Sequence, residues 1–316
     1  MKFLEKLTKK ENKFQRTVGL SMEKFRLLVN QLKNIWEKAE KQRKTHDNRK
    51  RDIGAGHPYK FQSLEDKVLI VLLYYKLYPT QELLGMIVGL DQTNISRLLK
   101  KMLPLIEKAA DPQLATYLEE AKQAASSIKR VNELNEFFEK YPDLKDVATD
   151  ATEQSCYRPK DNETQKHYYS GKKKRHTTKT QVAVSKTGRF LDVSDSYGGS
   201  THDKTIIDKE KTIQKFPPQT CQRFDSGYQG VKQENPYHYL VLPTKKPKGN
   251  ELSNVAKEHN RINSQRRVIA EHGISRIKKF RICSDRYRGP RKSHNQIFRN
   301  VASILNFKSG YSAVAM

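Results

Sequence analysis

The sequence is poor in cysteine and has no long apolar run. Three of its 316 residues are cysteines (Cys156, Cys221 and Cys283), and no two of them form a CxxC pair. This spacing argues against a zinc ribbon and against the disulfide framework of a secreted protein. We therefore expect each cysteine to be a small buried apolar residue in a reducing cytosol. No apolar run approaches the length of a transmembrane helix, and the first residues do not form a signal peptide.

Acidic residues are scarce beside basic ones. The chain has 61 Lys and Arg against 35 Asp and Glu, which gives a formal net charge of +26. Hydrophobic residues make up only 35% of the chain. Such an excess predicts a polyanionic partner, because counterion release from a nucleic acid would supply much of the affinity. DNA, RNA and an anionic membrane surface are the candidates, and the missing apolar span disfavours the membrane.

Residues 1–60 are expected to form a basic, partly helical N-terminal region. Ser21 is placed to cap a helix whose apolar residues, from Phe25 to Trp36, fall on one side. Residues 41–60 are rich in Lys and Arg and contain Pro58 near their end. They predict a basic, flexible connection to the next domain.

Residues 61–110 have the pattern of a helix-turn-helix domain. A capping box at Ser63 opens one helix, whose apolar residues are expected on one face. A short second helix ends near Gly89, and Asp91 opens a third. The third helix starts with polar residues, as a recognition helix does. These candidate DNA-binding residues are Gln92, Thr93, Asn94, Ser96 and Arg97. The alternative is an ordinary three-helix bundle with a polar surface, but the net charge favours DNA binding.

The character of the chain changes after a helical connector over residues 111–143. From 144 to 316, short strands alternate with turns and helices, and a mixed sheet flanked by helices is the natural arrangement. The expected strands are 145–150, the hairpin 177–185 with 189–196, 223–225 and 237–242. Helices are expected from Ser200, over 260–280 and over 291–310.

The helix expected over 260–280 carries one carboxylate between two cations. Arg267, Glu271 and Lys278 lie within roughly 40° of one another around a helix. Such a set is often a surface ion-pair helix. However, Asp150 and Asp225, upstream of this helix, each follow a short apolar run and are expected at the ends of strands. If the fold brings these two aspartates and Glu271 together, their carboxylates would suit two Mg²⁺ ions. The alternative for either aspartate is an ordinary turn residue.

Several short motifs follow one another along the chain in a fixed order. They are Asp150-Ala151-Thr152-Glu153, Arg158-Pro159-Lys160, Tyr168-Tyr169-Ser170-Gly171-Lys172-Lys173-Lys174-Arg175-His176, Gly199-Ser200-Thr201-His202-Asp203, Asp225-Ser226-Gly227-Tyr228-Gln229-Gly230, and Arg267, Glu271 and Lys278 at their spacing. Over residues 61–305 this order resembles the DDE-class insertion-sequence transposases, specifically the insertion-sequence-five group, which is related to Harbinger transposases.

The resemblance implies a ribonuclease-H-like α/β catalytic domain behind an N-terminal all-α helix-turn-helix domain. Asp150, Asp225 and Glu271 would be the catalytic, metal-binding triad, with two Mg²⁺ ions (or Mn²⁺) per site. Arg267 and Lys278 would bind DNA phosphates. The implied activity is hydrolysis at terminal inverted repeats and joining of the 3′-OH ends to target DNA. The implied setting is a dimer or larger assembly on double-stranded DNA, in the bacterial cytoplasm at the nucleoid.

Two positions depart from the family pattern. Ser264 stands where the family often has Tyr, which puts base stacking there in doubt, and Ala151 replaces a Gly. Lys172, Lys173, Lys174 and Arg175 form either a solvated charge run or, beside a catalytic strand, a DNA-backbone contact.

His202 and Asp203 could support the metal ligands or hold a further metal. Capping of the helix by Ser200 and Asp203 is the interpretation we favour for this segment. Two rival functions also remain at this point: a catalytically inactive DNA-binding regulator, and a nuclease that does not join strands.

Overall fold

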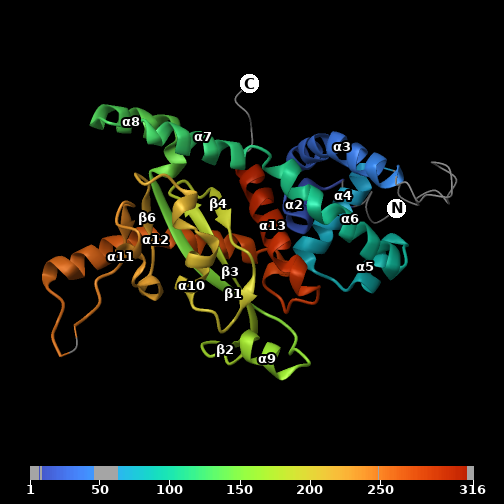
Figure 1. Ribbon diagram of the computed structural model, residues 1–316. Coiled ribbons are helices and arrows are strands. Elements are labelled where there is room, and N and C mark those ends of the chain that lie inside the picture. Colours follow the sequence, from blue (N-terminus) through green and yellow to red (C-terminus); the bar gives the residue numbers. More distant parts are fainter. Residues whose placement is uncertain (1–6, 8, 46–62, 248, 312–316) are drawn as a thin grey trace. The chain divides into compact units, whose positions relative to one another are not determined.

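The computed structural model describes residues 7, 9–45, 63–247 and 249–311 (Figure 1). They form two compact units. The first contains the described residues of Met1–Pro112 and Arg299–Met316 together with Lys279–Asp285, and the second contains Gln113–Lys278 and Arg286–Phe298. The units therefore do not follow the predicted ranges 111–143 and 144–316. The helices after Pro112 pack with the sheet, and the end of the chain packs with the N-terminal helices.

The first unit is helical, and two of its helices begin at the predicted caps Ser21 and Ser63. Ser21 Oγ accepts from the Lys24 N–H, Ser63 Oγ from Asp66, and Thr80 Oγ1 from Leu83. The helices are α2 (Glu11–Val18), α3 (Met22–Lys44), α4 (Leu64–Leu77), α5 (Gln81–Val88) and α6 (Gln92–Ala110), with the 3-10 turn η4 (Arg281–Cys283).

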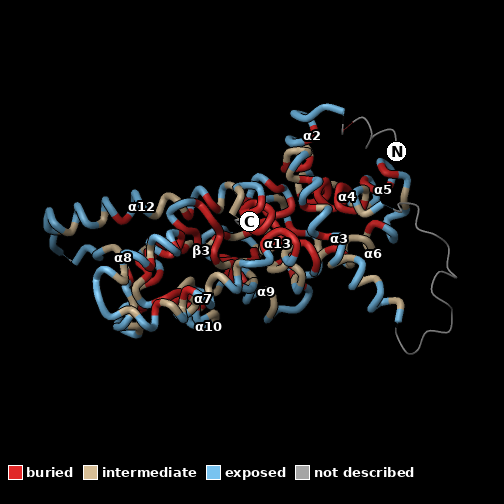
Figure 2. The backbone as a smooth tube through the Cα atoms, turned by 90° about the horizontal axis from the view of Figure 1, so that it is seen from above, coloured by how far each residue is buried: buried red, intermediate tan, exposed pale blue. Residues whose placement is uncertain are grey.

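Two expectations for this unit need correction. Helix α3 continues to Lys44, so the connection does not start at residue 41, and 46–60 lie outside the described residues. Helix α4 is buried on every side from Lys67 to Tyr75, not on one face (Figure 2). The reason is that α2, α3, α6 and η4 all pack around it.

The predicted turn between α5 and α6 is present. Gly89 adopts a left-handed conformation with φ of 71°, and the Leu90 N–H bonds to the Gly85 carbonyl at 2.8 Å. A Cβ at Gly85 would stand 2.3 Å from the Leu90 carbonyl oxygen, so the turn requires glycine there. This tight connection sets the start of α6 close behind α5, as the helix-turn-helix pattern predicts.

The second unit is built on the predicted mixed sheet. Its strand order is β2-β3-β1-β6-β7, with β4 and β5 also paired to β3. β1 is antiparallel to β3 but parallel to β6, and β6 is parallel to β7. The strands are β1 (Asp146–Ser155), β2 (Tyr169–Ser170), β3 (Arg175–Ser185), β4 (Phe190–Val193), β5 (Tyr197–Gly198), β6 (Cys221–Arg223) and β7 (Leu240–Val241).

Helices cover both faces of this sheet. Helices α7 (Leu114–Ser126), α8 (Val131–Lys140) and α10 (Asp203–Glu210) lie on one side, and α12 (Asn254–Lys278) crosses the other (Figures 1 and 2). The remaining elements are α9 (Asn162–Tyr168), α11 (Val231–Glu234), α13 (His294–Ser309) and the 3-10 turns η1 (Pro142–Leu144), η2 (Ile213–Lys215), η3 (Ser226–Tyr228) and η5 (Arg291–Ser293). Cys156, Cys221 and Cys283 are free and buried, as predicted.

The sheet differs from the prediction in three places. β1 runs five residues past Asp150, because β3 pairs with it along this whole length on one side. Residues 157–176, for which no strand or helix was expected, contain α9 and β2. The strand predicted over 237–242 is paired only at Leu240–Val241.

Candidate active site

The parallel pairing of β1 and β6 brings Asp150 and Asp225 together. Asp146, Val147 and Ala148 pair with Cys221, Gln222 and Arg223. The same register continued by two residues sets Asp150 level with Asp225, immediately beyond the end of β6. Asp150 is in the middle of its own strand, so only Asp225 has the strand-end position that both were expected to have.

Local hydrogen bonds hold both carboxylates. Asp225 Oδ1 accepts from the Gly227 N–H at 2.7 Å and so caps η3. Asp150 Oδ1 accepts from the Ala151 N–H at 2.8 Å. Burial raises the pKa of Asp150 to about 6, and the negative charges of Asp225 and Asp203 add to this against the opposing Ala151 bond and Arg267. Burial and the neighbouring carboxylates therefore disfavour the charged form of Asp150.

Helix α12 carries two cations into the electrostatic range of Asp150. Asn263 Nδ2 on this helix donates to the carbonyl oxygen of Phe224 at 3.5 Å, and Phe224 is the residue before Asp225. One turn later, Arg267 lowers the pKa of Asp150, and its buried Nε has no partner among the described residues. Burial lowers the pKa of Lys278, whereas Asp150 and Glu153 raise it. Both cations that the sequence picked out thus face the Asp150 strand.

Glu271 is on the same helix but is not part of a closed cluster. It is exposed, one turn from Arg267 on the helix that packs against β1 and β3. Within the described ranges, no group of three Asp, Glu, His or Cys side chains is arranged to hold a metal ion. The structure therefore brings Asp150, Asp225 and Arg267 together and leaves Glu271 at the rim.

Asp203 joins the site instead of capping its helix. The N-cap of α10 is His202, which makes no side-chain capping bond. The Ser200 hydroxyl donates to the His167 carbonyl, and Asp203 Oδ1 accepts from Lys179 at 2.9 Å. The predicted capping interpretation is wrong, because both of its side chains are engaged with other elements.

The donor set fits a hard divalent cation. The carboxylates of Asp225 and Asp203 lie close enough to Asp150 for their negative charges to raise its pKa. Oxygen ligands suit Mg²⁺, which proteins usually bind through one or two carboxylates, with substrate phosphates completing the shell. A closed three-carboxylate cage is therefore not required for binding in the presence of DNA.

Replacing Asp150 with asparagine is expected to stabilise the metal-free protein at pH 8. The raised pKa means that the folded state binds a proton more tightly than the unfolded state, so stability falls as pH rises from the unfolded pKa, about 4, through the folded pKa of about 6. Removing the charge should recover up to about 3 kcal/mol at pH 8 and little near pH 4. Urea unfolding in EDTA at both pH values would measure this. An Asp150→Asn protein no more stable than wild type at pH 8 would contradict it.

The other predicted DNA contacts are accessible. Gln92, Thr93, Asn94 and Arg97 are exposed on the first turns of α6, Ser96 is half-buried, and Ile95 between them is buried. Lys172, Lys173, Lys174 and Arg175 are exposed in the turn leading into β3. Lys173 lies close enough to Lys278 to lower its pKa. This basic turn and the α12 cations therefore belong to one surface.

Sequence reasoning missed three residues around the site. Lys179 is the partner of Asp203, and Arg223 forms a buried ion pair with Asp146 at 2.7 Å. Tyr228 is fully buried beside the carboxylates. Asp146 and Asp150 are four residues apart, so both side chains lie on the same face of one strand. This spacing was the available signal for a second acidic residue on the face of Asp150.

Comparison with known proteins identifies the family. A family described as "DDE superfamily endonuclease" matches residues 149–306, half of the chain, and "Helix-turn-helix of DDE superfamily endonuclease" matches 59–112. The chain is 28% identical over 303 residues to the "Probable transposase for insertion sequence element IS702" of Microchaete diplosiphon, covering 95% of this chain and 96% of that one. No solved structure matches it significantly. The matched region includes Asp150, Asp225 and Glu271, and the chain belongs to the DDE superfamily of endonucleases.

Proposed function

We propose that the protein is an insertion-sequence transposase. The helix-turn-helix binds the terminal inverted repeats, and the second unit hydrolyses the element's ends and joins the 3′-OH ends to target DNA. The observation that carries the proposal is the register of β1 and β6, which sets Asp150 level with Asp225 beside the cations of α12. The similarity to a transposase along 95% of the chain supports it.

The proposal extends to the subgroup and the fold. We place the chain in the insertion-sequence-five group, related to Harbinger, on the order of its motifs from Asp150 to Lys278. We assign a ribonuclease-H-like fold to the second unit. Its mixed sheet, in which the strand carrying one aspartate runs parallel to the strand that leads to the other, supports that assignment.

Asp150, Asp225 and Glu271 would hold two Mg²⁺ ions, or Mn²⁺, when DNA is bound. Such ions polarise the scissile phosphate and lower the pKa of a bound water or hydroxyl. The carboxylates supply the negative charge that attracts the ions. Glu271 would reach the site from α12, because it shares a helix face with Arg267 and Lys278.

The cations of α12 bind and orient the DNA backbone. The buried Nε of Arg267 near Asp150 has no partner in the described part of the chain, so a phosphate oxygen would give that donor an acceptor. Lys278 is eleven residues further along, about 16 Å at 1.5 Å per residue. Together with Lys172–Arg175 they would follow several phosphates of one strand.

Two chains would be needed to pair two DNA ends, so we propose a homodimer or larger assembly on double-stranded DNA, at the bacterial nucleoid. The net charge of +26 supports the polyanionic partner. Every helix among the described residues is too short or too polar to cross a bilayer.

Alanine at Asn94 or Arg97 is expected to weaken binding to the element's terminal repeats about tenfold or more. Both side chains are exposed on the first turns of α6, where base and phosphate contacts are made. Lys108→Ala, exposed at the far end of the same helix, is the matched control. A fluorescence-anisotropy titration with a duplex from the flanking DNA would measure this. Equal losses for Lys108 and Arg97 would rule out the predicted recognition surface.

A further inference from the structure

A buried tyrosine hydroxyl lies beside the carboxylates, and no other described residue pairs with it. Tyr228 is fully buried, and its ring packs 5.4 Å from that of Phe224 in a cluster with Ile207 and Val231. Its hydroxyl has no hydrogen-bond partner among the described residues. Burial raises its pKa, and the charges of Asp203, Asp150 and Asp225 raise it further. A donor is therefore held at the carboxylate group in a place where leaving it unpaired costs free energy.

Asp203 faces the same place from α10. Its Oδ1 accepts from Lys179 at 2.9 Å, and the same ammonium donates to the Thr201 carbonyl at 2.8 Å. The position of a Cβ at Gly227 would be 3.4 Å from Asp203 Oδ2 and 3.0 Å from Asp225 Oδ1. The two carboxylates thus flank this glycine, and Oδ2 is the oxygen of Asp203 that Lys179 leaves available.

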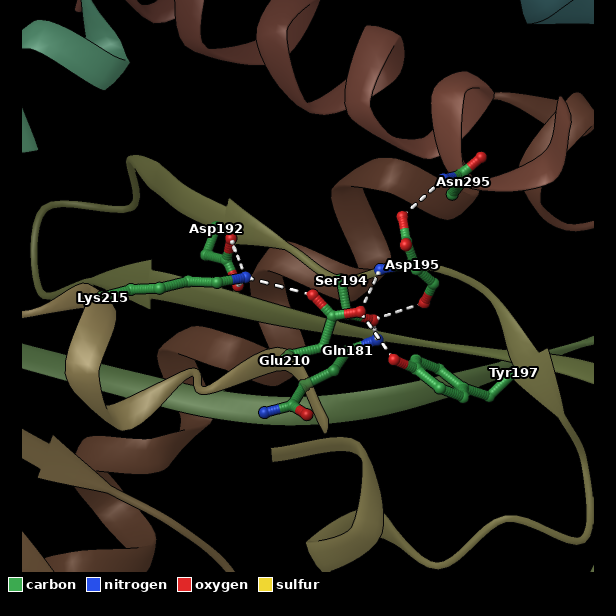
Figure 3. A network of polar contacts seen from close by, with 8 residues as sticks. All are labelled: Gln181, Asp192, Ser194, Asp195, Tyr197, Glu210, Lys215 and Asn295. Atoms are coloured by element: carbon green, nitrogen blue, oxygen red, sulfur yellow. Dashed lines mark hydrogen bonds and ion pairs between the residues drawn. The ribbon is translucent and has the colours of Figure 1, made fainter. Parts of the chain in front are cut away.

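The far end of α10 is anchored independently. Glu210, its last residue, accepts from the Asp195 N–H at 3.0 Å and from the Tyr197 hydroxyl at 2.7 Å, and it pairs with Lys215 (Figure 3). Lys215 also bonds Asp192 of β4. Because this network fixes the helix to β4 and β5, Asp203 at its first residue is held in place by contacts far from the site.

We propose that Asp203 is a further carboxylate ligand for the divalent cation beside Asp225, and that the Tyr228 hydroxyl is a positioning residue that donates a hydrogen bond to this pair. The proposal rests on the proposed function, since it assigns a cation to that site. Lys179 offsets the added negative charge and orients Asp203 so that Oδ2 faces Asp225. Two carboxylates with substrate phosphates are a common Mg²⁺ arrangement.

Mn²⁺ binding to the full-length protein tests this without relying on catalysis. Asp203→Asn keeps an oxygen for Lys179 but removes the charge, and should weaken Mn²⁺ binding about tenfold in electron paramagnetic resonance titrations. Asp208→Asn is the matched control, because Asp208 is on the same helix in a surface pair with Lys204. It should bind Mn²⁺ as the wild type does. Equal affinity of the Asp203→Asn and Asp208→Asn proteins would overturn the role of Asp203.

Tyr228→Phe tests the positioning role. It removes only the hydroxyl, so thermal unfolding in EDTA should occur at or above the wild-type temperature, whereas Mn²⁺ affinity falls severalfold. Wild-type affinity in this variant would overturn that role. Asp225→Asn separates the two proposals. If it binds Mn²⁺ as tightly as wild type, the proposed function fails as well; if it loses binding while Asp203→Asn does not, only the inference about Asp203 fails.

Discussion

Replacing Asp225 with asparagine is expected to slow cleavage of the element's ends by about a thousandfold or more, with end binding unchanged. The substitution removes one proposed metal ligand at the end of β6, and such groups act mainly on the charge that develops in the transition state. Asn keeps the oxygen that accepts from Gly227, so the local turn should be retained. Gel analysis of a labelled end fragment with Mg²⁺ would measure the rate.

Glu271→Gln is expected to have a similar effect, and it tests the residue that the structure leaves at the rim. Glu258→Gln is the control, because Glu258 is exposed on the same helix in a surface pair with Arg261. Cleavage by Glu271→Gln at the rate of Glu258→Gln would remove Glu271 from the site while leaving the two aspartates in it.

Arg223→Met is expected to destabilise the protein by about 3–5 kcal/mol. Arg223 donates through Nε to both oxygens of Asp146, at 2.7 and 2.9 Å, and both side chains are largely buried. Removing Arg223 leaves the buried Asp146 carboxylate with only the longer contact to the largely exposed Arg266. The pair joins β1 to β6 just before the two aspartates, so cleavage should also fall. Urea unfolding at pH 7 would measure the loss.

Arg266→Met provides a matched comparison for the same acid. Arg266 lies 3.3 Å from Asp146 Oδ2, but its side chain is 58% exposed. An exposed ion pair contributes at most about 1 kcal/mol. A loss for Arg266→Met as large as that for Arg223→Met would show that burial is not the deciding factor.

Much of the fold could be predicted from local patterns. Ser21 and Ser63 cap helices because their side chains accept backbone bonds at short range, which a sequence reveals directly. The meeting of Asp150 and Asp225 was predictable because each follows a strand-like run, although β1 is longer than expected. Its extra length comes from pairing with β3, which is a long-range effect.

The surroundings of the site could not be predicted in this way. Lys179 meets Asp203 across 24 positions in sequence, and nothing near either residue indicates the other. Ser200 and Asp203 have the spacing of a capping box, but bonds to His167 and Lys179 take both side chains away from the helix end. Tyr228 was expected only as part of a turn, and its burial depends on α10 and β7 packing around it.

The most direct test of the account is a strand-joining assay with the wild-type protein. A labelled duplex carrying the element's terminal repeats would be incubated with Mg²⁺ and a supercoiled target plasmid. We expect the 3′-OH ends of the duplex to become covalently joined to the plasmid, and the product to disappear with EDTA and with Asp225→Asn. Cleaved ends without joined product would indicate a nuclease. Bound but uncut DNA would indicate a regulator. Either result would contradict a transposase.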